Sequence, residues 1–277
     1  MDHGLTISAQ EFGLIRALVY ERFGINLTDQ KRALVVGRLQ KLLRDGGFSS
    51  FKQYHEAVTT DESGAALDRL INRISTNYTY FNREQAHFHF FTHTVLPALV
   101  ARQRADNHLD LRIWSAGCSS GEEPYMLTML MMEHLGHDYD SWSAGVLATD
   151  ISDQALGKAR RGIYEEEQVA KIPAAIKQKY FTRREDGSWQ VGEKVQNQVT
   201  FRRFNLMNRQ FPFKKPFQVI FCRNVMIYFD TPTRQALVKR YHRHLEPGGY
   251  LFIGHSESLG REQDDFQYIM PAVYRRN

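Results

Sequence analysis

The sequence predicts an α/β protein in which a small all-helical domain precedes a doubly wound, mostly parallel sheet. Between residues 7 and 105, apolar residues recur at the three- and four-residue spacing of helices. From residue 111 to residue 161, strand-like apolar runs alternate with helical patterns, as in parallel sheets with crossover helices. We therefore expect a helical domain at 1–105 and a sheet domain at 106–277.

The composition limits the classes of protein to which this chain can belong. At 277 residues, with 42% hydrophobic and 24% charged residues, the chain has enough apolar surface for a globular core. No apolar run has transmembrane length and the start lacks a signal-peptide layout, so we expect a cytoplasmic protein. The net charge of +5 suits an acidic protein partner. Nucleic acid is disfavoured because the aromatic residues follow apolar patterns rather than an exposed basic platform.

The helical part is expected to contain helices at about 9–23, 28–45, 48–58, 62–76 and 82–104. Within the second of these, Arg38, Lys41 and Arg44 recur every three residues and form a basic stripe on one side. Such a stripe is either ordinary solvated surface or a docking face for an acidic partner.

A strand–loop–helix unit at 111–136 is the first candidate for a binding site. Its loop is made of small residues and contains Gly117 and Gly121, a spacing that matches neither dinucleotide nor phosphate-binding loops. The carboxylates of Glu122 and Glu123 follow, which suits an amino group, a cationic centre or sugar hydroxyls better than phosphate. Alternatively, both carboxylates only complement the helix dipole.

Two further strands are expected to end at the same sheet edge. The strand within 142–152 ends in Asp150, where doubly wound nucleoside-binding folds hold ribose hydroxyls. The apolar strand 217–222 delivers Arg223, Asn224 and Tyr228 to that edge. Together with Gly117 and Glu123, these residues predict a nucleoside site.

The remaining segments refine the fold. A hairpin turn at Asp186–Gly187 and alternating strands, including one through Val199 and Phe201, predict a small antiparallel β insertion at about 176–203. The chain ends with two strands joined by a loop. This arrangement is typical of the Rossmann-like sheet of class I methyltransferases, whose last strand is antiparallel, whereas dehydrogenases keep their strands parallel.

Only two cysteines, Cys118 and Cys222, are present. They are too few and too far apart in the sequence for a zinc site, so we expect no metal. Their strands are expected to be neighbours, which makes a pair conceivable, but two free thiols are favoured in a reducing compartment.

At the level of motifs, the chain resembles the CheR family of chemotaxis receptor glutamate methyltransferases over nearly its whole length. The resemblance rests on the order and spacing of these segments: a basic helix after DQKR, TNYTYFNRE at 76–84, WSAGCSSGEEPY at 114–125, ATDIS at 148–152, FNL at 204–206, FCRNVMIYFD at 221–230 and GHSESL at 254–259. The chain departs from the family pattern at Asn82, where a second Phe is usual, and at Met126, where Ser is common.

The resemblance implies a cofactor, a substrate and site residues. The cofactor is S-adenosyl-L-methionine, with S-adenosyl-L-homocysteine as product. The substrates are glutamates on the cytoplasmic helices of methyl-accepting chemotaxis receptors, and the enzyme is expected to be a monomer that reaches the membrane only through them. Arg83 and Tyr228 are implied to flank the point of methyl transfer, and Arg38, Lys41 and Arg44 to dock the receptor. The implied cofactor contacts are Asn77, Thr79, Arg83, Glu123, Asp150, Asn205, Leu206, Asn224 and Val225, to which the loop argument above adds Gly117.

In this family the β insertion can grip a peptide at the receptor's C-terminal tail. The hairpin at 185–189 is shorter here than in the tail-binding form, so we expect an enzyme that does not depend on such a peptide.

Two other functions stay open at this point. A regulatory module that senses S-adenosyl compounds would bind the cofactor without transferring its methyl group. A methyltransferase for nucleic acid or small molecules would be favoured by an Asn/Asp-Pro-Pro-Tyr-like motif, but CRNVMIYF follows the 217–222 strand instead.

Overall fold

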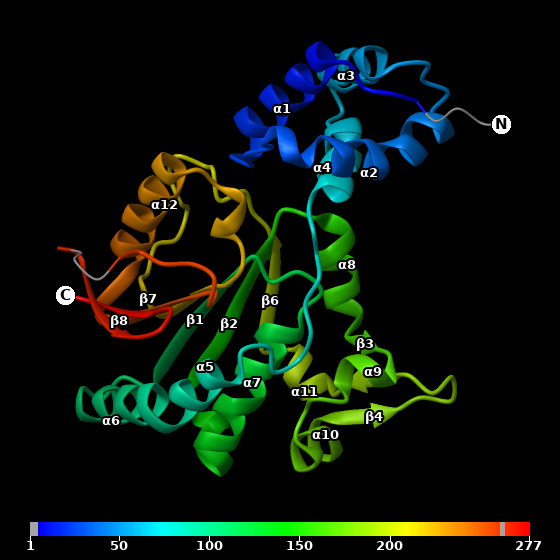
Figure 1. Cartoon of the computed structure of the whole chain (residues 1–277). Helices are drawn as coiled ribbons and strands as arrows, with labels where there is room; N and C mark the ends of the chain where they lie inside the picture. The colour runs from blue at the N-terminus through cyan, green and yellow to red at the C-terminus, as the bar shows by residue number, and fades with distance from the viewer. Residues whose placement is uncertain (1–4, 261–263) are drawn as a thin grey trace.

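The computed structural model describes residues 5–260 and 264–277. It shows a helical domain that lies at the carboxyl ends of the parallel strands of a seven-stranded sheet (Figure 1). None of the described helices is long and apolar enough to cross a membrane. The helical domain contains four helices and one 3-10 turn: α1 (Ala9–Phe23), η1 (Asp29–Lys31), α2 (Arg32–Asp45), α3 (Phe51–Thr60) and α4 (Ala65–Ile74).

The helices of this domain begin where the sequence provides caps. The Ser8 hydroxyl accepts a hydrogen bond from the Glu11 N–H at 3.2 Å, and the Glu11 carboxylate accepts one from the Ser8 N–H at 2.8 Å. This capping box fixes the first turn of α1. The Ser50 hydroxyl caps α3 by accepting a hydrogen bond from the Gln53 N–H. The domain is held together by the apolar faces that the helical spacing predicted.

The large sheet has the order β6-β2-β1-β7-β8-β10-β9. The strands from β6 to β8 pair in parallel, whereas β10 is antiparallel to both of its neighbours. The predicted fold class, with an antiparallel last strand, is confirmed. The strands are β1 (Asp110–Ala116), β2 (Ser143–Asp150), β6 (Val199–Arg203), β7 (Phe217–Cys222), β8 (Leu245–Ile253), β9 (Phe266–Met270) and β10 (Val273–Arg276).

Side chains of the central strands alternate between two cores. On one face, Trp114 packs among aromatic rings of the 204–217 segment and Tyr241 of α12. On the other face, Ile113 and Val219 belong to the core that α5 to α8 build. The helices around the sheet are α5 (Gln85–Phe90), the π-helix η2 (Phe91–Val95), α6 (Leu96–Ala105), α7 (Glu122–Leu135), η3 (Gly136–Ser141), α8 (Asp153–Arg161), η4 (Met226–Tyr228) and α12 (Thr231–His244).

The small β insertion exists, but its composition differs from the prediction. A three-stranded antiparallel sheet has the order β3-β5-β4, and the 185–187 turn joins β4 to β5. The strand through Val199 and Phe201, predicted to belong to the insertion, instead pairs in parallel with β2 as an edge of the large sheet. The insertion contains β3 (Ile163–Tyr164), α9 (Glu166–Val169), α10 (Ala174–Tyr180), β4 (Phe181–Arg183), β5 (Trp189–Val191) and α11 (Glu193–Gln196).

The packing of α6 and η2 indicates where the helical domain ends. The sequence pattern predicts that it reaches residue 105. However, α6 contacts β1 and α7, and η2 contacts α7, so these helices cover the sheet. From this packing we propose that the helical domain ends with α4.

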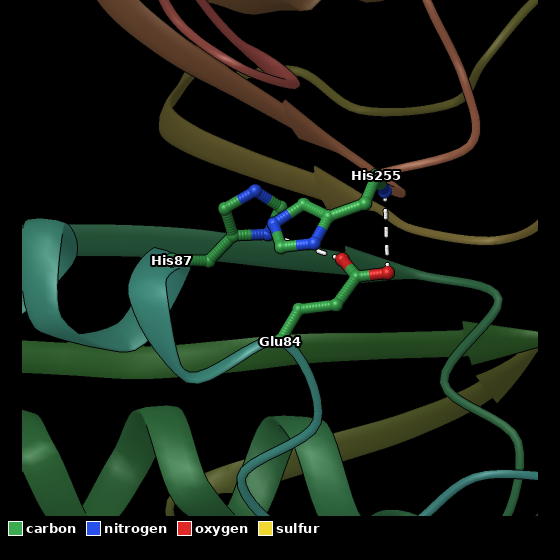
Figure 2. Close-up of side chains that lie close together, drawn as sticks. All are labelled: Glu84, His87 and His255. Carbon is green, nitrogen blue, oxygen red and sulfur yellow. Dashed lines mark hydrogen bonds and ion pairs between the residues drawn. The ribbon is translucent and has the colours of Figure 1, made fainter.

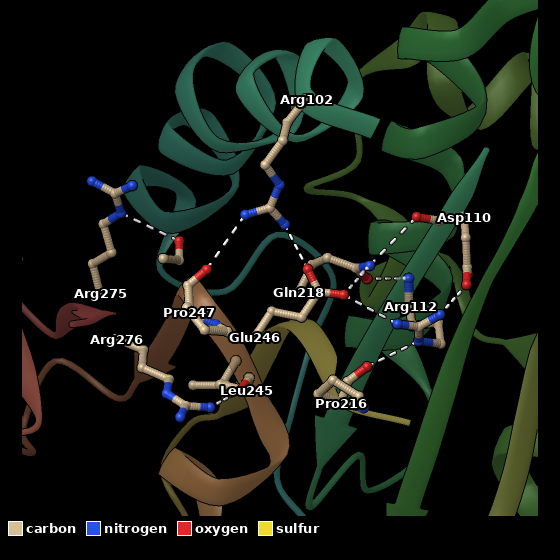
Figure 3. Close-up of polar contacts among 11 residues, drawn as sticks. Arg102, Asp110, Arg112, Pro216, Gln218, Leu245, Glu246, Pro247, Arg275 and Arg276 are labelled. Atoms are coloured by element: carbon tan, nitrogen blue, oxygen red, sulfur yellow. Dashed lines mark hydrogen bonds and ion pairs between the residues drawn. The ribbon is translucent and has the colours of Figure 1, made fainter. Parts of the chain in front are cut away.

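A network of polar side chains lies at the amino ends of the parallel strands, opposite the site described below (Figure 3). Glu246 of β8 accepts hydrogen bonds from Arg102 of α6 at 2.6 Å, Gln218 of β7 at 2.8 Å and Arg112 of β1 at 3.1 Å. The Gln218 side chain also accepts a hydrogen bond from the Arg112 N–H at 2.6 Å. These hydrogen bonds connect β1, β7 and β8 to one another and to α6.

Candidate active site

A cavity of about 1070 Å³, part of it open to solvent, lies at the carboxyl edge of the large sheet. Its walls come from α1, from the 74–83 segment after α4, and from the loops that follow β1, β2, β6 and β7. The structure brings together around it every residue that the family resemblance implied for the cofactor or the reaction: Asn77, Thr79, Arg83, Gly117, Glu123, Asp150, Asn205, Leu206, Asn224, Val225 and Tyr228.

Gly117 lets the loop after β1 lie close to the loop after β7. Its φ of +89° is in the left-handed region, and a Cβ atom there would lie 2.4 Å from Cγ2 of Val225. The N–H groups of Gly117 and Cys118 both donate to the Thr149 carbonyl of β2, at 2.7 and 2.9 Å. A side chain at position 117 would overlap Val225 and force these two loops apart.

Asp150 ends β2 with its carboxylate fixed by backbone groups. Oδ2 accepts a hydrogen bond from the Ser119 N–H at 2.8 Å, and Oδ1 accepts one from the Ser152 N–H at 2.9 Å. Burial raises the pKa of Asp150, and these N–H groups oppose that shift. The oriented carboxylate has further lone pairs with which it can accept hydrogen bonds from paired hydroxyls in the cavity.

Arg223 connects the two sides of the site. Its side chain is 3% exposed, donates from Nη1 to Glu123 at 3.0 Å and donates from Nε to Glu84 at 3.2 Å. A further bond runs from Nη2 to the carbonyl of Arg83. Burial raises the pKa of Glu123, and the Arg223 charge opposes that shift. This buried arginine therefore ties the 74–84 segment to the start of α7.

Asn224 adopts a conformation that its surroundings impose. Its φ is +59°, in the left-handed region that Asn tolerates better than most residues. Its N–H donates to the Glu257 carboxylate at 3.0 Å, and its amide donates to Glu84 at 3.2 Å. Gly254 must lack a side chain because a Cβ there would lie 2.4 Å from the Asn224 amide nitrogen.

The two residues implied in the reaction reach the cavity from different segments of the chain. The Arg83 guanidinium donates to the Tyr78 carbonyl at 3.0 Å and lies 6.0 Å from the centre of the Tyr80 ring. Tyr228 lies on η4, and its carbonyl accepts a hydrogen bond from the Asn26 N–H at 2.8 Å. Both side chains line the cavity and are partly exposed.

Polar groups also join the helical domain to this edge. The Asn77 carbonyl accepts a hydrogen bond from the Ser119 hydroxyl at 2.9 Å, which fixes the 74–83 segment above the first loop. On the other side, the Asn205 amide donates to the Arg22 carbonyl of α1 at 2.7 Å. The neighbouring Leu206 is buried and supplies an apolar wall.

Asn82 explains one departure from the family pattern. Its φ is +60°, so the left-handed conformation favours Asn over the Phe that is usual there. Its amide donates to the Lys171 carbonyl at 3.4 Å and so contacts the segment before α10. Glu122 also faces the insertion, since its carboxylate accepts hydrogen bonds from Ser120 and Gln168.

The basic stripe of α2 lies apart from the cavity lining. Arg38 donates to the Ile74 carbonyl and, at 2.7 Å, to the Thr76 hydroxyl, so it supports the segment that carries Asn77. Lys41 and Arg44 are exposed. The three residues therefore differ in their surroundings although their spacing is regular.

Both cysteines are free and buried, in agreement with the prediction of two free thiols. The Cys222 sulfur accepts a hydrogen bond from the Tyr241 hydroxyl at 3.0 Å. Burial raises the pKa of both thiols well above its usual value, which keeps them protonated.

Sequence reasoning missed three supporting residues. It placed Arg223 at the sheet edge without a role, and it assigned none to Glu84 or Glu257. Glu257 accepts hydrogen bonds from the N–H groups of Asn224, Ile227 and Gly254. The available signal was charge: Glu84 lies within a segment that carries site residues, and Glu257 within one that matches a family motif.

Comparison with known proteins identifies the family. The sequence model for "CheR methyltransferase, SAM binding domain" matches residues 77–274, and that for "CheR methyltransferase, all-alpha domain" matches residues 10–75. The chain belongs to the CheR methyltransferase family. It is therefore an S-adenosylmethionine-dependent methyltransferase, as the sequence motifs implied.

Named CheR relatives are similar over almost their full length. The chemotaxis protein methyltransferase of Borreliella burgdorferi is 42% identical over 273 residues, which cover 99% of this chain and 96% of that protein. The chemotaxis protein methyltransferase of Escherichia coli is 37% identical over 277 residues, covering 99% and 93%. A probable chemotaxis protein methyltransferase of Rhizobium etli is 38% identical over 264 residues, covering 93% and 96%.

The residues of the CheR site suit the cofactor. The cradle at Gly117 has no space for a side chain, and the oriented Asp150 carboxylate suits ribose hydroxyls. The Glu123 carboxylate is already engaged by Ser115 and Arg223, so it shapes the site through these two side chains. When bound, S-adenosylmethionine supplies an electrophilic methyl group on a sulfonium centre.

Proposed function

We propose that this enzyme methylates glutamate side chains on chemoreceptors, forming methyl esters. The observation that supports this most is that Arg83 and Tyr228 line the same cavity as Asp150 and Glu123. A guanidinium and a phenol are suited to bind and orient a carboxylate. The names of the related proteins agree with a role in chemotaxis.

The lining of the cavity suits a nucleophile that needs no activation. A glutamate carboxylate is already ionised at neutral pH, so no general base is required. Consistent with this, the described lining residues include no histidine. Arg83 would bind the incoming carboxylate, Tyr228 would orient it by donating a hydrogen bond, and Phe23 and Ile25 would exclude water.

The receptor would dock on the helical domain. Methylated receptor helices carry glutamates, and the exposed Lys41 and Arg44 on α2 offer complementary charge. We propose that these two residues contact the receptor, whereas Arg38 contributes mainly by supporting the 74–83 segment. The enzyme would act as a monomer in the cytoplasm, on the receptor's cytoplasmic helices.

We also propose that the enzyme does not need a tail peptide of the receptor. The support is the tight β4–β5 hairpin, whose turn closes through the Ser188 and Asp186 side chains. Calorimetric titration with a receptor tail pentapeptide should give no measurable heat of binding. Micromolar affinity would overturn this part of the proposal.

The proposed function is tested by incubating the enzyme with methyl-labelled S-adenosylmethionine and receptor-bearing membranes. Label should enter the receptor and be released as methanol by mild base, as expected for an ester. Binding of cofactor without transfer would indicate a sensing module instead. Base-stable label would indicate methylation of nitrogen and exclude a glutamate ester.

A further inference from the structure

A cluster of one carboxylate and two imidazoles lies next to the active site (Figure 2). Glu84 precedes α5, His87 lies on α5, and His255 lies in the loop after β8. One potential ligand atom from each residue lies within 4.8 Å of the other two. From this geometry we propose that the cluster binds a divalent transition-metal ion of the zinc type.

The surroundings of His87 provide a second, independent observation. Its side chain is fully buried, yet neither ring nitrogen forms a hydrogen bond of regular geometry within the described part of the chain, although the Pro271 backbone lies near the ring. Its Nδ1 lies 3.3 Å from Oε2 of Glu84 without forming a hydrogen bond. Buried polar atoms are normally satisfied, so an unpartnered imidazole that faces a carboxylate indicates a missing partner.

The protonation state of His87 suits a metal ligand. Burial lowers its pKa to about 4, and the nearby Arg223 charge acts in the same direction. The imidazole is therefore neutral at physiological pH, as a metal ion requires.

His255 completes the cluster and provides access. Its ring is exposed and lies at 4.5 Å from the His87 ring, centre to centre, in an edge-to-face arrangement. Its N–H already donates to Oε1 of Glu84 at 3.2 Å, which holds the loop in place. Zinc bonds to nitrogen and oxygen are about 2.0–2.2 Å long, so two ligand atoms of one ion lie at most about 4.4 Å apart. Rotation of the exposed His255 side chain can close the remaining gap.

The donor set selects the class of metal. Two imidazoles and one carboxylate suit zinc and its neighbours, whereas calcium and magnesium prefer oxygen ligands. The Arg223 guanidinium opposes a cation because it donates to the same Glu84 oxygen. A metal ion would therefore compete with Arg223, and we expect weaker binding than in a structural zinc site.

Competition with Arg223 links the cluster to the reaction. Arg223 also donates to the Arg83 carbonyl, so loss of its contact with Glu84 would disturb the position of Arg83. Zinc should therefore lower methyl transfer. This consequence rests on the proposed function, whereas the binding of the ion does not.

Zinc binding to the full-length, metal-stripped enzyme can be measured by competition with a chromophoric chelator. The test variant is His255→Ala, because its side chain is exposed and the loop contact through its N–H is kept. The matched control is His93→Ala, since His89 and His93 stack at 4.2 Å on a helix surface and are themselves a possible zinc pair. A buried variant, His87→Gln, is added if circular dichroism shows that it folds.

We expect His255→Ala to weaken the tightest zinc equivalent by at least about tenfold, since removing even a supporting group of a metal ligand costs that much. His93→Ala should keep this equivalent. The proposal is overturned if wild type and His255→Ala bind zinc alike, or if only His93→Ala loses binding. Neither result depends on methyl transfer, so it leaves the proposed function untouched.

Discussion

Arg223 shows how much of this site depends on a residue that need not touch the substrate. Its guanidinium neutralises Glu84 and Glu123, contacts the Phe88 ring at 5.2 Å and supports the backbone at Arg83. A buried charge is stable only when its partners are present, so these contacts act as a unit. We regard Arg223 as a positioning residue.

Replacing Arg223 tests this role. Arg223→Met leaves two carboxylates without a buried counter-charge and should lower the free energy of unfolding by about 3–5 kcal/mol. Arg223→Lys restores the charge but not the fork, so it should recover part of the stability while kcat stays low and the KM for cofactor changes less. Urea denaturation and steady-state kinetics measure both effects. Wild-type kcat in Arg223→Lys would contradict the positioning role.

Gly117 offers a matched test of the cavity. Gly117→Ala introduces a Cβ at 2.4 Å from Val225, in addition to the cost of a positive φ, about 1–2 kcal/mol. Gly187 has a similar φ of +85°, but a Cβ there has no neighbour within 4 Å. We expect both variants to lose stability, Gly117→Ala more than Gly187→Ala, and only Gly117→Ala to lose affinity for S-adenosylhomocysteine in calorimetric titration. Equal affinities in the two variants would show that the cofactor does not use this cradle.

Substitutions of Arg83 and Tyr228 should have different effects on the reaction. Arg83→Ala should abolish turnover because it removes the group that binds the carboxylate. Tyr228→Phe should lower kcat by about tenfold to a hundredfold, the value of one hydrogen bond to a charged group, and leave cofactor affinity nearly intact. Transfer assays and equilibrium titration separate the two. A parallel loss of cofactor binding in Tyr228→Phe would remove its assigned role.

The basic residues of helix α2 lie in two different environments. Arg38 hydrogen-bonds to the end of α4 and to the segment beyond it, while Lys41 and Arg44 are exposed. The regular spacing of the three residues does not reveal this difference, because the contact of Arg38 with residues 74 and 76 depends on how α4 packs against α2.

Charge reversal distinguishes the two proposed roles of these residues. Lys41→Glu with Arg44→Glu should weaken transfer to receptor membranes and leave cofactor affinity unchanged, more strongly at low salt because exposed charges are screened. Arg38→Glu should weaken cofactor binding as well, since it releases Thr76 next to Asn77. The measurements are transfer at two salt concentrations and cofactor titration. Unchanged transfer in the Lys41/Arg44 variant would leave these residues as ordinary surface.

The β insertion and the neighbouring edge strand show the limit of local patterns. β6 alternates buried and exposed residues because an edge strand is covered on only part of its surface. The same alternation is typical of a hairpin, which is why the pattern through Val199 and Phe201 predicts a strand of the insertion. Pairing with β2 is a long-range contact, and no local signal in the sequence specifies it.

At the scale of the molecule, the site exists only because two domains meet. The Tyr20 hydroxyl of α1 donates to Asp230 at 2.8 Å, and the Ser152 hydroxyl donates to Asn72 of α4 at 2.6 Å. Arg203 of β6 also pairs with Asp68 of α4. These contacts hold the helical domain over the carboxyl edge of the sheet (Figure 1).

Much of this arrangement could be predicted from the sequence, for a physical reason. Parallel strands deliver their last residues to one edge, so the order of strands and loops is enough to group Gly117, Asp150 and Asn224. The Glu84–Arg223 ion pair and the Glu84, His87 and His255 cluster could not be predicted, because they join segments far apart in the chain. Their partners become apparent only when α5 packs beside the loop after β8.

The central claim is that the cofactor lies across the carboxyl edge of the sheet, with its reactive centre between Arg83 and Tyr228. A crystal structure with S-adenosylhomocysteine tests it most directly. We predict ribose hydroxyls on the Asp150 carboxylate and a sulfur atom facing the space between Arg83 and Tyr228. A nucleoside bound away from Asp150 and Asn224, or an Arg83 side chain turned to bulk solvent, would contradict the account.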